Sequence, residues 1–166
     1  MRTRVVAFLL FCAGVPATVW AQNVEMVFTP AVAEQAVALK SAMSVDKTNV
    51  NAFGALALVG APAARKKAYA DSVAKNAAVV IVGEDALKAV AEIEFSVPVI
   101  VVNATGKCAA RVRVIRVFDA GSTAAPPGAV LGDSIASVGQ AVRSGGEVVL
   151  KGNVTWIVRV ALAALR

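Results

Sequence analysis

The sequence predicts a three-layer α/β domain of the Rossmann-like type, with a mostly parallel sheet of five to six strands. Apolar runs of strand length alternate along the chain with segments of helical composition, which is typical of a parallel sheet covered by helices on both faces. The runs Val79–Val82 and Val99–Val102 contain only β-branched residues, as expected for central strands that are buried on both faces.

The first elements follow from apolar runs and from the residues that punctuate them. A strand is expected at 24–28. Thr29 and Pro30 come next and suit the N-cap and the first position of a helix, which is expected over 31–43. The polar segment 46–51 is then expected to be a turn.

The middle of the chain repeats this alternation. The apolar run 55–59 is expected to be the second strand and to end at Gly60. Pro62 opens a helix that is expected to continue to about Asn76. Between the two β-branched runs a shorter helix is expected over 84–94, so that both strands lie parallel in one β-α-β unit.

The C-terminal part contains the remaining elements. Residues 111–118 alternate cations with apolar side chains, which predicts a strand nearer the sheet edge, where the cations reach solvent. Asp133 is expected to cap a helix that ends at Gly145. A last strand over 147–150 and a closing helix over 154–166 complete the fold.

The N-terminus has the composition of a secretory signal peptide. A short positive region at 1–4 precedes an apolar run over 5–15, and this run is shorter than the roughly 20 residues that span a bilayer. Val19 and Ala21 then occupy positions −3 and −1 of a cut before Gln22. The signal predicts a periplasmic or secreted protein with no stable membrane insertion after cleavage.

The domain organisation that follows is a signal peptide over 1–21 and a single α/β domain over 22–166. Cys108 is then the only cysteine outside the signal, and a buried thiol is expected there. The net charge of the whole chain is +6, but Arg65-Lys66-Lys67 is the only tight basic cluster and no aromatic residues interleave with it. Nucleic acid is therefore not expected as a partner.

Catalytic chemistry has little support in this sequence. The chain contains no histidine, no serine-nucleophile motif and no set of soft metal ligands. We therefore expect no enzymatic activity, no catalytic residues, no metal and no cofactor. A cleft that gathers Asp119, Asp133 and Ser122 would revive the enzyme hypothesis.

The segment Val79–Leu87 is the strongest motif, because a buried strand ends at Gly83 and a helix follows at once. Ligands of open parallel sheets bind beyond the carboxyl ends of the strands. Glu84 and Asp85 place negative charge at the first helical turn and could satisfy its amides themselves, which disfavours a phosphate or nucleotide. Two interpretations stay open here, a structural corner and the rim of a binding site.

Small polar residues and glycines also gather at the other predicted strand ends. Such residues suit a neutral, hydrogen-bonding ligand, although ordinary loops have the same composition. The candidate ligand-binding residues are Thr29, Gly60, Gly83, Glu84, Asp85, Asn103, Thr105, Asp119 and Ser122.

The segment from Asn76 to Asn103, NAAVVIVGEDALKAVAEIEFSVPVIVVN, resembles the periplasmic substrate-binding proteins of a poorly characterised ABC transporter family. The shared features are a strand that ends in Gly83, a helix that begins with a small residue before Ala86-Leu87, and Pro98 before a Val-rich strand. The resemblance implies a protein that closes two lobes on a small solute, often an amino acid or a similar molecule. It also implies that Gly83, Glu84 and Asp85 line the cleft. This chain has the length of one such lobe.

Two functional hypotheses follow. The first is an exported solute-binding or accessory protein, related to ABC-transporter binding components, that binds a small polar solute at the carboxyl ends of the strands. The second is an envelope structural or interaction protein of the same fold without a small ligand. In either case another envelope protein or a second copy of the chain is a candidate partner.

Overall fold

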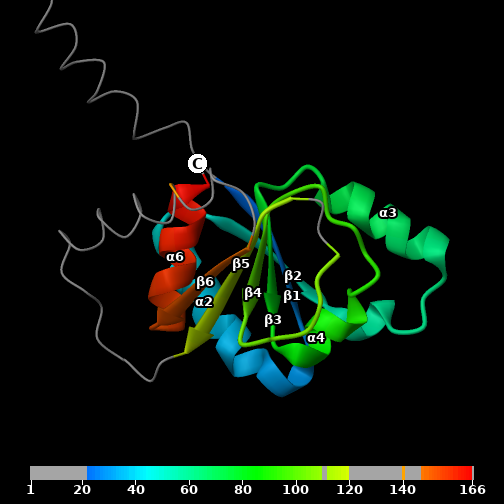
Figure 1. The fold of residues 1–166 in the computed structure, drawn as a ribbon, viewed down its shortest axis with the longest axis horizontal. Coiled ribbons are helices and arrows are strands. Elements are labelled where there is room, and N and C mark those ends of the chain that lie inside the picture. The colour runs from blue at the N-terminus through cyan, green and yellow to red at the C-terminus, as the bar shows by residue number, and fades with distance from the viewer. Residues whose placement is uncertain (1–21, 110–111, 120–139, 141–146, 166) are drawn as a thin grey trace, which may run out of the picture.

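The structure is a computed structural model that describes residues 22–109, 112–119, 140 and 147–165. Within these residues one six-stranded sheet has the order β2-β1-β3-β4-β5-β6, and every neighbouring pair is parallel (Figure 1). This confirms the expected Rossmann-like fold class. The strands are β1 (Asn23–Phe28), β2 (Asn49–Gly54), β3 (Ala78–Val82), β4 (Val99–Val102), β5 (Val114–Asp119) and β6 (Glu147–Gly152).

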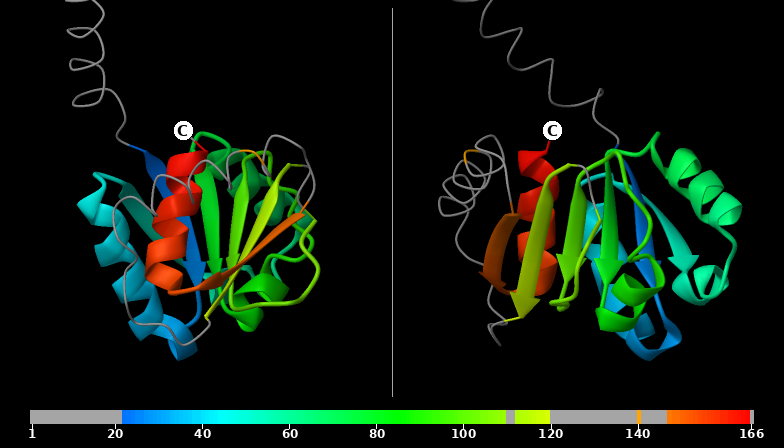
Figure 2. Two further views of the ribbon diagram at one scale, coloured as in Figure 1. Left: turned by 60° about the vertical axis from the view of Figure 1, so that its left-hand side comes forward. Right: turned by 45° about the vertical axis from the view of Figure 1, so that its right-hand side comes forward.

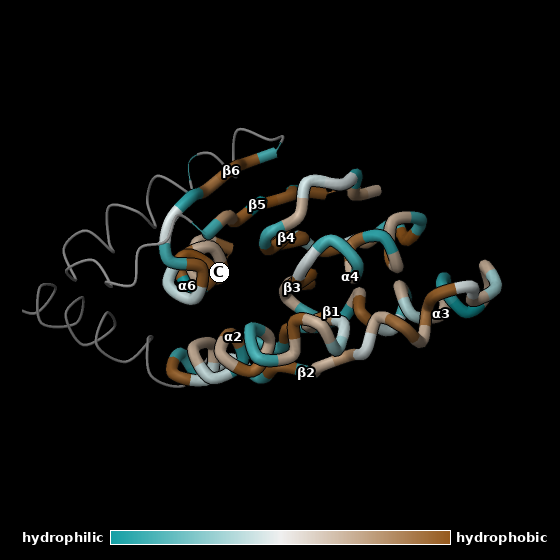
Figure 3. Tube along the Cα trace, turned by 90° about the horizontal axis from the view of Figure 1, so that it is seen from below, coloured by the Kyte–Doolittle hydropathy of each residue, from teal (hydrophilic) through white to brown (hydrophobic). Residues whose placement is uncertain are grey.

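Helices cover both faces of the sheet, which gives three layers (Figure 2). Seen from below, α2 and α6 lie on one side of the strands, whereas α3 and α4 lie on the other (Figure 3). The helices are α2 (Ala33–Val45), α3 (Ala63–Val73), α4 (Glu84–Ala89) and α6 (Val154–Ala164), and two short 3-10 helices are η1 (Pro30–Val32) and η2 (Ala55–Leu58).

The core is divided by the sheet into two clusters, because successive residues of a strand point to opposite faces. In β3, Val80 and Val82 belong to the cluster under α2 and α6. Val79 and Ile81 belong to the cluster under η2 and α4. All five residues of β3, and all four of β4, are buried, which confirms the two-sided burial predicted for these central strands.

The second strand lies earlier in the chain than predicted. The run expected to be a strand, 55–59, forms η2 instead, and the segment expected to be a turn, 46–51, contains the start of β2. β2 is the outermost strand and pairs only with β1. Its residues are at most half-buried, so it lacks the apolar run by which buried strands are recognised.

The other elements lie close to their predicted positions. Ala36, Leu39 and Met43 form the buried face of α2. α4 ends earlier than expected, at Ala89, and β6 continues further, to Gly152. Of the helix predicted after Asp133, only residue 140 is described, and it is helical.

Two interactions join the C-terminal helix to the rest of the domain. The side chain of Asn153 caps α6 by accepting a hydrogen bond from the Trp156 amide at 3.1 Å. Arg159 on α6 forms a two-point ion pair with Asp46 at the end of α2, with N–O distances of 2.7 and 2.9 Å. None of the helices in the described ranges is both long and apolar enough to cross a membrane.

Candidate functional site

The candidate site lies at the carboxyl edge of the sheet, where strands that run in one direction all end together. Thr29, Gly83 and Asn103 directly follow β1, β3 and β4, and Asp119 is the last residue of β5. These four positions agree with the prediction. Gly60 follows η2 and not a strand, which corrects its expected place. Ser122 lies outside the described residues.

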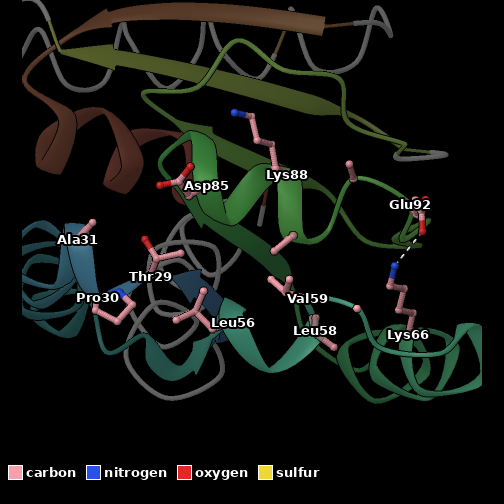
Figure 4. A pocket seen from close by; sticks show the side chains of 13 residues that line it. Thr29, Pro30, Ala31, Leu56, Leu58, Val59, Lys66, Asp85, Lys88 and Glu92 are labelled. Carbon is pink, nitrogen blue, oxygen red and sulfur yellow. Dashed lines mark hydrogen bonds and ion pairs between the residues drawn. The ribbon is translucent and has the colours of Figure 1, made fainter.

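A cavity of about 700 Å³ opens at this edge between α4 and the two 3-10 helices. We call it the carboxyl-edge pocket. It brings together three of the predicted site residues, Thr29, Gly60 and Asp85. In Figure 4, Thr29 and Asp85 lie next to each other at one end of the pocket, and Lys66 and Glu92 lie at the other end.

The lining of the carboxyl-edge pocket is apolar along its middle and polar at its ends. Leu58 is 2% exposed and forms part of the floor, whereas Leu56 and Val59 stand at the rim with 60% and 62% of their surface exposed. Thr29 is buried and, as predicted, occupies the N-cap position before Pro30, but its side chain makes no capping hydrogen bond to η1. Its hydroxyl group is therefore not used by the adjoining helix.

Charged side chains occupy the two ends of the pocket. Asp85 and Lys88 are both exposed residues of α4. At the other end, Lys66 Nζ lies 2.7 Å from Glu92 Oε2. Hydrogen bonding to Lys66 and its positive charge hold the pKa of Glu92 below its ordinary value. The pocket can thus offer both signs of charge to one small molecule.

Glu84 has a different place from Asp85, although the two are neighbours in the sequence. It does not line the carboxyl-edge pocket. Its carboxylate accepts hydrogen bonds from the amides of Thr105 and Gly106, at 2.8 and 3.0 Å. The sequence interpretation had Glu84 satisfying amides of its own helix, whereas it satisfies those of the loop after β4. A Cβ atom on Gly106 would lie 2.6 Å from Glu84 Oε1, so a larger residue there would displace the Glu84 carboxylate.

Asn103 and Asp119 belong to a second part of the same edge. Asn103 has a positive φ of 52°, and its side-chain oxygen accepts a hydrogen bond from the Asp119 amide at 2.9 Å. Asn103 thereby joins the ends of β4 and β5. Together with Glu84 and Thr105, these residues form the polar network of the β4 loop and not the wall of the carboxyl-edge pocket.

Arg116 is the residue of this edge that sequence reasoning placed wrongly. It was expected to reach solvent from a strand near the edge, but β5 is covered by β6, and only 8% of Arg116 is exposed. Its guanidinium group donates to the carbonyl oxygens of Ala104 and Gly106, at 2.9 and 2.7 Å, and pairs with Glu147. Its position within an apolar strand could have indicated burial, and a buried cation needs fixed hydrogen-bond acceptors around it.

Of the two interpretations that the sequence left open, a structural corner and the rim of a binding site, the geometry of Gly83 supports the structural corner. Its backbone has φ 86° and ψ 163°, a conformation that is accessible essentially to glycine alone. Its amide is not free for a ligand, because it donates to the Val102 carbonyl at 2.9 Å. Gly83 therefore turns the chain from β3 into α4, and the adjoining pocket is lined by Asp85 rather than by Gly83 itself.

The described residues provide no obvious metal site and only part of the alternative catalytic cluster. No group of three or more Cys, Asp or Glu side chains lies close enough to hold a metal ion in the described part of the chain. Cys108 is half-buried rather than fully buried as expected, and it packs against the α4-side core. Asp133 and Ser122, which would have to gather with Asp119 to revive the enzyme hypothesis, lie outside the described residues.

Comparisons with protein-family models, with curated proteins and with solved structures find no match to this chain. The resemblance to ABC-transporter binding proteins therefore depends on the segment from Asn76 to Asn103 alone. The fold and the carboxyl-edge pocket are the features from which a function can be argued.

Proposed function

We propose that this protein is an exported solute-binding or accessory protein, related to ABC-transporter binding components, that holds a small polar solute in the carboxyl-edge pocket. The observation that carries the proposal is the pocket of about 700 Å³ at the strand ends, lined by Thr29, Gly60 and Asp85. Ligands of open parallel sheets bind at this edge. A cavity of this size lies within the range of small-molecule sites.

The lining suggests the chemistry of the solute. An apolar middle formed by Pro30, Leu56 and Leu58 suits a short hydrocarbon part. Asp85 and Lys88 can pair with opposite charges on one molecule, so a zwitterion such as an amino acid is the preferred class. Since Leu56 and Val59 are largely exposed at the rim, a second body that covers them would enclose the solute.

Export is consistent with the position of the first strand. β1 begins at Asn23, so a cut before Gln22 would remove no residue of the sheet. Gln22 itself is buried and its carbonyl accepts a hydrogen bond from the Asn49 amide at 2.7 Å. The predicted cleavage site therefore adjoins the folded domain without interrupting it.

Thermal unfolding in the presence of amino acids and similar zwitterions tests the proposal. A solute at about a hundredfold excess over its Kd stabilises the native state by about 2.7 kcal/mol, which raises the Tm of a domain of this size by about 5–10 °C. Asp85→Asn and Thr29→Val are expected to reduce this shift. Glu34→Gln, an exposed change on α2 across the sheet, is the matched control and should retain it.

The second candidate is an envelope interaction protein that binds no small molecule. The observation that favours it is that Glu84, Asn103 and Thr105 are used to fix the β4 loop. If no zwitterion changes the Tm at millimolar concentration, the solute-binding proposal fails. Cross-linking in cells would then be expected to capture an envelope protein through the exposed Leu56 and Val59.

A further inference from the structure

A second cavity lies on the α3 side of the sheet, toward the amino ends of β1 and β2. Its volume is about 550 Å³, and we call it the amino-edge recess. It is separate from the carboxyl-edge pocket, with which it shares no lining residue. The residues that carry the argument are Asn23, Glu25, Asn49, Asn51, Phe53 and Tyr69.

Glu25 forms the polar base of this recess. It is 4% exposed and lies in the middle of β1 between apolar residues. One carboxylate oxygen accepts from Asn51 Nδ2 at 2.6 Å, and the other accepts from the Tyr69 hydroxyl at 2.9 Å. Both partners are neutral donors. A carboxylate has about four acceptor positions, so each oxygen can accept one more hydrogen bond.

The charge of Glu25 is not balanced within the recess. Among the described residues that line it, Glu25 is the only charged one. Buried charges in proteins are ordinarily paired with an opposite charge or a metal ion. Burial and the nearby negative charge of Glu25 raise the pKa of the Tyr69 phenol above its ordinary value, so Tyr69 adds no charge to the recess. Among the described lining residues, the recess thus places one carboxyl group, that of Glu25, beside neutral donors and no cationic side chain.

The other walls are suited to an organic cation. Asn49 donates through Nδ2 to Asn23 Oδ1 at 3.2 Å, and Asn51 donates to Glu25. Their side-chain oxygens are thereby left as acceptors. Phe53 and Tyr69 form an aromatic wall, with ring centroids 4.5 Å apart. A carboxylate, amide oxygens and aromatic rings together are the groups that bind an ammonium ion in proteins.

We propose that the amino-edge recess binds a small organic primary ammonium ion through Glu25. The ammonium group would donate to Glu25 and to the oxygens of Asn49 and Asn51, and its methylene groups would contact Phe53 and Tyr69. A divalent metal is a poorer occupant, because the recess supplies one carboxylate, whereas calcium and magnesium sites use several oxygen ligands with more charge.

Calorimetric titration of the purified protein with putrescine tests this proposal. Saturable binding is expected for the wild-type chain. Glu25→Gln keeps the shape of the side chain and removes its charge, so the Kd is expected to rise about tenfold or more. Glu34→Gln is the matched control, because it removes an exposed carboxylate of α2 on the other face of the sheet and should leave the Kd for putrescine unchanged. Butane-1,4-diol, which has the same chain without charge, is expected not to bind.

A measurement on the wild-type protein keeps the test decisive if Glu25→Gln does not fold. The side-chain amide signals of Asn49 and Asn51 are expected to shift in NMR spectra on addition of putrescine, whereas that of Asn103 at the opposite edge should not. No saturable binding at millimolar putrescine, or an equal Kd for wild type and Glu25→Gln, would overturn the proposal. Since the zwitterion test concerns the other pocket, its outcome does not decide this one.

Discussion

Gly83 shows at the scale of one residue how backbone geometry fixes the corner between β3 and α4. Its φ of 86° and ψ of 163° belong to a region that costs other residues about 1–3 kcal/mol. A Cβ atom there would also lie 3.3 Å from Val32 Cγ1. We expect Gly83→Ala to lower the free energy of unfolding by about 2 kcal/mol or more, as measured by urea denaturation.

Gly54→Ala is the matched control for this prediction. Gly54 has a negative φ of −76°, and a Cβ atom there would meet nothing within 4 Å. The change should leave stability equal or raise it by about 0.4–1 kcal/mol, because it restricts the unfolded chain. Equal losses for both variants would show that the conformation of Gly83 is not the cause.

The contribution of the buried cation Arg116 to stability can be measured with a single variant. Arg116→Met would leave the carbonyl groups of Ala104 and Gly106 without their donor. We expect a loss of about 2–3 kcal/mol, because two carbonyl groups lose the charged donor that they share. Arg113→Met is the control in the same region, because Arg113 is exposed and its loss should cost about 0.5 kcal/mol or less. Urea denaturation of both variants measures the difference, and similar values would contradict the role of Arg116.

At the scale of an element, α6 depends on the N-cap residue that precedes it, Asn153. Asn153 Oδ1 accepts from the Trp156 amide and from the Thr155 hydroxyl, at 3.1 and 2.7 Å. We expect Asn153→Ala to lower the free energy of unfolding by about 1 kcal/mol, the usual effect of a lost N-cap. Asn153→Asp retains an acceptor at this position and should stay close to wild type in thermal unfolding. A loss of the same size in both variants would argue against capping.

The elements also differ in how well their sequence predicts them. β3 and β4 were predicted within one residue, because burial on both faces selects an unbroken β-branched run. β2 was missed, because it is an edge strand whose exposed residues include Asn49 and Asn51. Its pairing with β1 is made by backbone atoms, and backbone pairing leaves no pattern in the side chains.

The candidate site was predictable in outline for the same reason. A parallel order fixes which end of each strand lies at the ligand edge, so Thr29 and Asp85 could be named from the chain alone. That Asp85 lines the pocket while Glu84 bonds to the β4 loop depends on the rotation of α4 above the sheet. Similarly, the sequence shows Glu25 only as one acid in an apolar strand, which is a weak indication of a site. Tertiary packing decides both the different roles of Glu84 and Asp85 and the role of Glu25.

At the scale of the whole molecule, the N-terminal segment 1–21 is expected to be removed on export. A chain expressed in an exporting host is expected to be cut between Ala21 and Gln22, because small residues at −3 and −1 direct cleavage. Intact-mass measurement of the purified protein checks this, and Ala21→Arg, which changes the −1 position, should retain the longer chain. Recovery of wild-type protein that still carries residues 1–21 would contradict export by this signal.

The helices α3 and α6 differ in how much of their surface is buried against the sheet, and this difference affects how easily each one moves. α6 buries Val154, Val158 and three further residues, whereas Val73 is the single fully buried residue of α3. Segments with few buried contacts open at low free-energy cost. Amide hydrogens of α3 should therefore exchange with deuterium sooner than those of α6. Opening of α3 would carry Tyr69 away from Glu25, so the amino-edge recess would gain and lose its cover through a local fluctuation of one helix.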